Sequence, residues 1–141
     1  MRFMVIVKAT AESEREVVPE DQEAMAAMGR FNEELVKAGV MLAGEGLHPS
    51  SKGVRLSFGA GGKRTVVDGP FAETKELVAG FWILQTKTRE ECIEWMKRAP
   101  FEPGSTLEIR QVAEAEDFAA ADPTGELRAQ EKRLRETAPS R

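Results

Sequence analysis

The sequence of 141 residues contains one cysteine, one histidine and no tyrosine. A single cysteine excludes an internal disulfide and fits a reducing cytosol. One histidine and one cysteine cannot supply the usual ligand sets of a zinc site, so we predict no metal centre. Cys92 falls within a helical pattern, and we expect it to be a small core residue rather than a nucleophile.

Long apolar runs and an excess of positive charge are also absent. No stretch approaches the ~20 apolar residues of a membrane-spanning helix. The N-terminal run leads straight into charged sequence without a small-residue cleavage site, so we expect no signal peptide. The 20 basic and 24 acidic residues give a net charge of −4, which does not favour a nucleic-acid partner. We therefore predict a cytoplasmic protein that binds neither membranes nor nucleic acids.

The remaining pattern is that of a mixed helix and strand domain with 41% hydrophobic residues. Hydrophobic periodicity predicts, in order, strand, helix, strand, an added hairpin, strand, helix and strand. Two βαβ halves with an inserted hairpin indicate an α+β, ferredoxin-like split βαβ fold. The predicted elements cover residues 2–8, 20–38, 40–43, 54–67, 77–85, 88–99 and 106–112.

The segments around this framework are predicted as follows. Residues 9–19 are polar and indicate a loop. The domain is expected to span 1–116, followed by a charged helical tail at 117–141 that packs on a partner subunit or frays. In the first helix, apolar residues three and four positions apart predict a buried stripe. Its members are Ala24, Met28, Phe31 and Leu35, widened by Met25 and Val36.

The run at residues 77–85 is the most apolar in the chain. Such a strand needs cover on both faces, by helices on one side and by a partner subunit on the other. We therefore expect a homodimer. Phe81 and Trp82 must point to opposite faces of a regular strand, and Gly80 suggests a bulge or a close backbone approach.

The stretch at residues 66–76 sits between two strand patterns and differs from an ordinary hairpin turn. Pro70 has no N–H and cannot close a tight turn after Asp68-Gly69. The chain should leave the strand at Asp68, bend stiffly and bury Phe71 as an anchor. Asp68 then lies at a strand end, where binding and catalytic groups often sit. The alternative is that Asp68 only accepts hydrogen bonds from loop amides.

This stretch resembles the signature of the YCII-related, or DGPF-domain, proteins. The resemblance rests on Val67–Glu76 followed by Gly80–Ile83, and is similar at Glu45–Gly53 and Ile93–Arg98. It covers roughly residues 1–116. What it implies is a ferredoxin-like fold of the dimeric α+β barrel type and a cleft suspected of enzymatic activity. It implies no established reaction; genes of some members lie beside sigma-factor genes, which hints at regulation.

Candidate chemistry centres on His48 and Asp68, which border the hairpin in the predicted fold. A carboxylate that orients an imidazole is a workable acid–base pair, and Asp68 falls on the acidic position of the family motif. The hypotheses are a cofactor-free enzyme acting on an unknown small molecule, a non-catalytic ligand-binding or regulatory module, and a structural dimer module. The predicted substrate contacts are Ser50, Ser51, Lys75, Phe71 and Trp82.

Overall fold

The computed structural model describes residues 1–15, 21–72 and 76–139. These residues form two compact units, Met1–Gln111 and Val112–Arg141. The strands are β1 (Arg2–Lys8), β2 (Met41–Gly46), β3 (Val54–Phe58), β4 (Arg64–Asp68), β5 (Val78–Gln85) and β6 (Leu107–Gln111). The α-helices are α1 (Ala11–Arg15), α2 (Gln22–Lys37), α3 (Arg89–Met96) and α4 (Glu126–Thr137).

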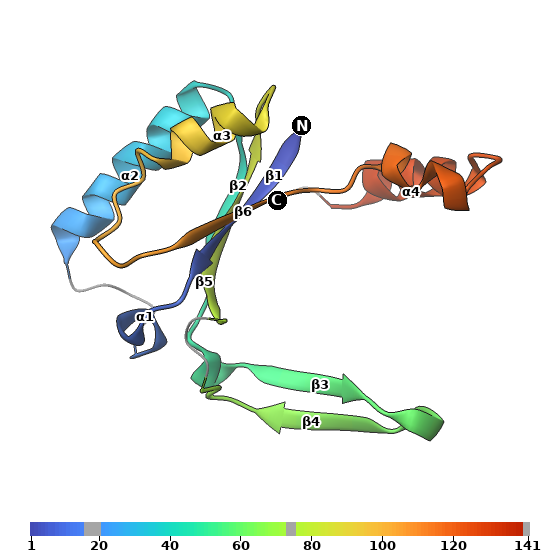
Figure 1. Cartoon of the computed structure of the whole chain (residues 1–141), viewed down its shortest axis with the longest axis horizontal. Coiled ribbons are helices and arrows are strands. Elements are labelled where there is room, and N and C mark those ends of the chain that lie inside the picture. The colour runs from blue at the N-terminus through green and yellow to red at the C-terminus, as the bar shows by residue number, and fades with distance from the viewer. Residues whose placement is uncertain (16–20, 73–75, 140–141) are drawn as a thin grey trace. The chain divides into compact units, whose positions relative to one another are not determined.

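The main sheet has the order β2-β5-β1-β6 with antiparallel neighbours throughout. Helix α2 connects β1 to β2 and α3 connects β5 to β6, which is the ferredoxin-like split βαβ arrangement. Strands β3 and β4 form a separate two-stranded sheet inserted between β2 and β5. Figure 1 shows α2 and α3 on one face of the main sheet. The predicted fold class and the inserted hairpin are confirmed.

The hydrophobic core lies between the main sheet and these two helices. Alternate residues of β1 and β5 are buried, as expected for strands with one covered face. The core residues are Phe3, Val5, Phe31, Leu35, Val40, Trp82, Leu84, Cys92 and Met96. Cys92 is fully buried, and burial together with the nearby Glu91 carboxylate raises the pKa of its thiol to about 11. The prediction of a core cysteine is therefore confirmed.

Two predictions about the N-terminal segments are wrong. Residues 11–15, within the predicted loop, form α1. The buried stripe of α2 is narrower than predicted, since Met25 and Val36 are 50% and 60% exposed. Ala24 of the predicted stripe is exposed as well, and the α2 residues in the core cluster or packed against it are Met28, Phe31 and Leu35.

The hairpin is more exposed than its sequence pattern predicts. All five residues of β3 and all five of β4 are exposed, although the alternation of apolar and polar residues in Val54–Phe58 is that of a half-buried strand. A two-stranded sheet has no second layer of its own to cover an apolar face. Among the described residues nothing packs across it, so Leu56 and Phe58 remain 51% and 70% exposed.

The second unit contains a 3₁₀ helix at Ala115–Ala121 and the helix α4. The tail at 117–141 was predicted to be helical, and α4 lies within it. Asp122 lies before this helix, and its carboxylate accepts hydrogen bonds from the backbone N–H groups of Leu127 at 3.1 Å and Arg128 at 3.0 Å in the first turn. The Arg128 Nε donates to the same carboxylate at 3.0 Å. Within the described ranges, no helix has the length and apolarity to cross a membrane.

Candidate functional site

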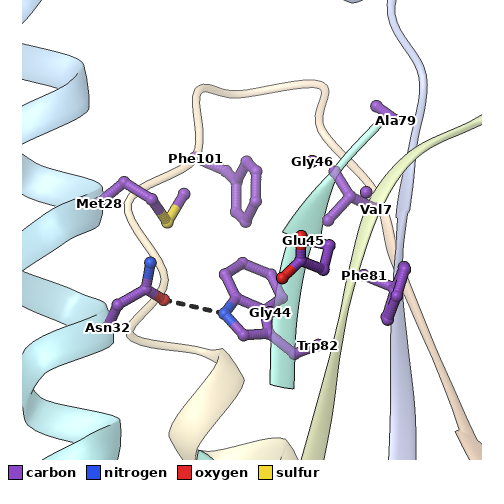
Figure 2. A pocket seen from close by; sticks show the side chains of 11 residues that line it. Val7, Met28, Asn32, Gly44, Glu45, Gly46, Ala79, Phe81, Trp82 and Phe101 are labelled. Carbon is purple, nitrogen blue, oxygen red and sulfur yellow. Dashed lines mark hydrogen bonds between the residues drawn. The ribbon is translucent and has the colours of Figure 1, made fainter. Parts of the chain in front are cut away.

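A cavity of about 230 Å³ lies between α2, the segment after α3 and the strands β2 and β5. Figure 2 shows the side chains around it. Its walls are mainly apolar, with one amide and one carboxylate among the lining side chains. The apolar side chains on the helix-covered side of the sheet are Val7, Met28, Trp82 and Phe101, and the polar lining residues are Asn32 and Glu45.

Trp82, predicted as a ligand contact, is held rigidly at this cavity. It is buried on β5, and its ring meets Phe31 and Phe101 edge to face, with 6.1 Å between centroids in each pair. Its Nε1–H donates a hydrogen bond of 2.8 Å to Oδ1 of Asn32 on α2. Two ring contacts and one hydrogen bond therefore fix the orientation of the indole. Phe81 points to the opposite face, as predicted from strand alternation.

Two glycines give the strands their spacing beside the indole. A Cβ added to Gly44 would lie 2.9 Å from Cδ1 of Trp82 and 2.7 Å from Cε of Met41. A Cβ added to Gly80 would lie 2.8 Å from the backbone oxygen of Glu45. The close backbone approach predicted at Gly80 is confirmed. Small residues at these positions are what allow Trp82 to lie against β2.

A second cluster lies where the hairpin joins the main fold, around Ser50. The Ser50 N–H donates to Oε2 of Glu14 at 3.0 Å, and its hydroxyl donates to Oε1 of the same carboxylate. The Ser50 Oγ in turn accepts a hydrogen bond of 3.0 Å from the N–H of Phe71. Ser50 and Phe71, both predicted as ligand contacts, are thus brought together. This serine joins α1 to the segment that follows β4.

The segment at residues 69–71 is shaped by further contacts. The Gly69 N–H donates to the Gly53 carbonyl at 2.9 Å, and the Gly69–Pro70 peptide bond is cis. The Arg55 guanidinium lies 3.8 Å above the centre of the Phe71 ring. Phe71 is half-buried, so it anchors the segment against an arginine rather than within the hydrophobic core.

The structure does not bring the side chains of the other predicted site residues that it describes into hydrogen bonds with one another. Asp68, the last residue of β4, is exposed, as are His48 and Ser51. Within the described residues, no hydrogen bond or ion pair joins His48 to Asp68. Lys75 lies outside the described residues. An acid–base role for His48 and Asp68 therefore stays a prediction.

The cavity also contains residues that sequence reasoning missed. Asn32 is the only asparagine in the chain and lies four residues after Met28, on the core-facing side of a helix. A polar amide at such a position is a usable signal, because buried polar groups need hydrogen-bond partners. Glu45 and Phe101 lie in segments without helical or strand periodicity around them and carried no comparable signal.

Comparison with known proteins relates the sequence of this chain to a family. The sequence profile described as the YCII-related domain matches residues 1–116. The chain belongs to the YCII-related domain family. An uncharacterised protein of Rhizobium meliloti (strain 1021), similar to this chain, is 31% identical over 78 residues. That match spans 55% of this chain and 62% of the length of the relative.

A solved structure is also similar to this YCII-related protein. It is 5-chloro-2-hydroxyhydroquinone dehydrochlorinase from Burkholderia phenoliruptrix AC1100, in complex with 2,5-dihydroxybenzoquinone. The likeness has 14% sequence identity and a TM-score of 0.43, and covers 83% of this chain and 98% of the other. At that TM-score we draw nothing from it about this chain. Function must be argued from the site, since a fold hosts many functions.

Proposed function

We propose that this YCII-related protein binds a small, largely apolar molecule in the cavity beside Trp82. The observation that carries the proposal is the composition of that cavity. Aromatic and aliphatic side chains form most of its wall, and a few polar groups converge on it. This combination is typical of sites for small organic ligands.

The size of the cavity indicates the size of the ligand. Its volume is about 230 Å³. A dry apolar cavity of about 150 Å³ in another protein already accepts benzene. A single ring with one or two small substituents therefore fits here. Contact with Trp82 and Phe101 favours a flat ring, which stacks well against aromatic side chains.

Binding can be measured through the fluorescence of Trp82. The chain contains two tryptophans, so Trp95→Phe leaves Trp82 as the only indole reporter. We expect single-ring aromatic compounds to change its emission in a saturable way. Gly46→Leu provides the matched control, because Gly46 lines the cavity and a Cβ there meets nothing within 4 Å. Leucine at this position should fill the cavity and weaken binding. Equal binding by both proteins would place the ligand elsewhere and contradict the proposal.

Turnover by His48 and Asp68, neither of which lines the cavity, is a finer proposal. What supports it is that His48 follows Gly46 of the cavity wall by two residues, and that the Leu47 N–H bonds to the Ala79 carbonyl at 2.8 Å. The segment that carries His48 is therefore tied to the cavity edge. An enzyme should lose rate, without losing the fold, as such a pair titrates. A ligand-binding or regulatory module should bind with little dependence on His48→Ala.

We also propose that the protein works as a homodimer. The face of the main sheet opposite the helices carries cross-strand apolar pairs, Met4 with Ile83 and Ile6 with Phe81. A Lys8–Glu108 ion pair of 3.4 Å borders them. An apolar centre with charges of both signs beside it suits a self-complementary two-fold interface.

The dimer is tested by sedimentation of the wild type and two variants. Ile83→Glu should give a monomer, because it places a charge within the apolar centre of the interface. Val54→Glu is the matched control, since Val54 is an exposed apolar residue of the hairpin. A wild-type monomer, or a dimer that survives Ile83→Glu, would contradict the proposal. Dissociation by Val54→Glu alone would assign the interface to the hairpin.

A further inference from the structure

The orientation of the Asn32 side chain follows from the chemistry of its partner. An asparagine amide has one oxygen that accepts hydrogen bonds and one NH₂ group that donates them. The indole Nε1–H of Trp82 can only donate. The Asn32 atom that lies 2.8 Å from Nε1 must therefore be the oxygen, as it is here. The opposite assignment would set two donors against each other.

This orientation leaves the NH₂ group of Asn32 for other partners. Among the described residues no protein group accepts a hydrogen bond from Nδ2, and this nitrogen is not a buried atom without a partner. Since Asn32 lines the cavity, its NH₂ group is open to whatever occupies that space. Figure 2 shows the nitrogen on the side of Asn32 away from the indole, towards Met28.

The other described side chains that line the cavity do not offer a ligand a comparable hydrogen-bond donor. Of the described side chains that line the cavity, only Asn32 and Trp82 carry an N–H. The Trp82 N–H is already used by Asn32. An ionised Glu45 carboxylate can only accept hydrogen bonds. The NH₂ of Asn32 is therefore the side-chain donor that a ligand meets.

We propose that Asn32 determines ligand specificity, by donating from Nδ2 to a carbonyl oxygen on a single-ring ligand. The inference rests on the proposed binding function and names the ligand class of that site: ring compounds that carry a hydrogen-bond acceptor. A ring that presents a donor at this place leaves two donors facing each other. One well-formed neutral hydrogen bond corresponds to about a 3- to 10-fold gain in affinity.

The test compares two probes of similar shape, acetophenone and ethylbenzene, of which only acetophenone has an acceptor. Their dissociation constants are measured from Trp82 emission in the Trp95→Phe protein. Asn32→Asp is then added, because aspartate keeps an oxygen for Trp82 and replaces the NH₂ group by a second acceptor. We expect the affinity ratio of acetophenone to ethylbenzene to fall by about 3- to 10-fold or more. The ratio cancels changes that affect both probes equally.

A second variant covers the case in which Asn32→Asp does not fold. Asn32→Leu has the same number of side-chain heavy atoms and the same branching at Cγ and removes the donor, so it should lower the same ratio. An unchanged ratio in a folded variant would overturn the role of Asn32 while leaving the cavity as a binding site. If neither probe binds the Trp95→Phe protein, the proposed function itself fails, and the inference about Asn32 fails with it.

Discussion

The carbonyl oxygen of Ser50 lies so close to Gly69 that a Cβ on this glycine would overlap it. The two residues belong to segments on either side of the hairpin. Their contact is backbone to backbone, so it cannot be relieved by rotating a side chain. The Gly69 N–H also bonds to the Gly53 carbonyl at 2.9 Å. The segment after β4 is thus held directly against the turn at residues 50–53.

Gly69→Ala should destabilise the protein. The added methyl group must displace one of the two segments, and such overpacking typically costs ~1–3 kcal/mol of unfolding free energy. Denaturant unfolding measures this cost. Gly46→Ala is the matched control, because a Cβ at Gly46 meets nothing within 4 Å. Equal unfolding free energies for the two variants would show that the segments separate readily.

Ser50→Ala should also be destabilising, for a different reason. It removes the oxygen that accepts from Phe71 N–H and the hydroxyl that donates to Glu14. Leaving part-buried polar groups without partners costs ~1–3 kcal/mol. The exposed neighbour serves as the control: Ser51→Ala should stay within about 0.5 kcal/mol of the wild type. Glu14→Ala combined with Ser50→Ala should cost less than the sum of the two single changes, because both remove one shared network.

Asp68→Ala should leave the stability nearly unchanged. Its carboxylate is exposed and has no hydrogen bond within the described residues, and such surface changes stay within about 0.5 kcal/mol. Asp21→Ala is the contrast, because Asp21 accepts from the N–H groups of Glu23 and Ala24 at the start of α2. Losing that cap should cost ~1 kcal/mol. A loss of several degrees in the melting temperature of Asp68→Ala would identify Asp68 as a structural residue and weaken the acid–base hypothesis.

The second unit should respond to acid through Asp122. Burial alone raises the pKa of this carboxyl, but the hydrogen bonds from Arg128 and Leu127 outweigh it and hold the pKa below its ordinary value. A carboxyl with a lowered folded-state pKa contributes stability above its unfolded value and loses it as the pH falls through the folded one. The amide signals of Leu127 and Arg128 in NMR spectra should therefore titrate with a midpoint below about 3.9.

Asp122→Asn is the control for this titration. The variant keeps a side-chain oxygen for the cap but cannot ionise, so the amide signals should no longer follow the pH in this range. A midpoint at or above the ordinary aspartate value in the wild type would show that the cap does not favour the ionised form.

The order of the elements was predictable from local patterns. Alternation and helical spacing involve residues a few positions apart, and they identified the strands, the two crossover helices and the inserted hairpin. Local chemistry also accounts for the helix start predicted at residue 88, where the Thr88 hydroxyl accepts from the N–H of Glu91 at 3.1 Å. Strand alternation correctly assigned Phe81 and Trp82 to opposite faces of the sheet, and a glycine within a strand correctly indicated a close backbone approach at Gly80.

Tertiary structure decided the contacts that build the cavity and the base of the hairpin. Asn32 and Trp82 are 50 residues apart, and Glu14 and Ser50 are 36 apart. No local periodicity specifies such pairs, because they depend on how helices and strands pack. The same holds for the hairpin: its alternation is that of a half-buried strand, but burial requires a covering layer, and the described residues provide none. The sequence by itself determined the strands, the two crossover helices and the inserted hairpin, because their patterns are local, and packing determined which polar groups face the cavity.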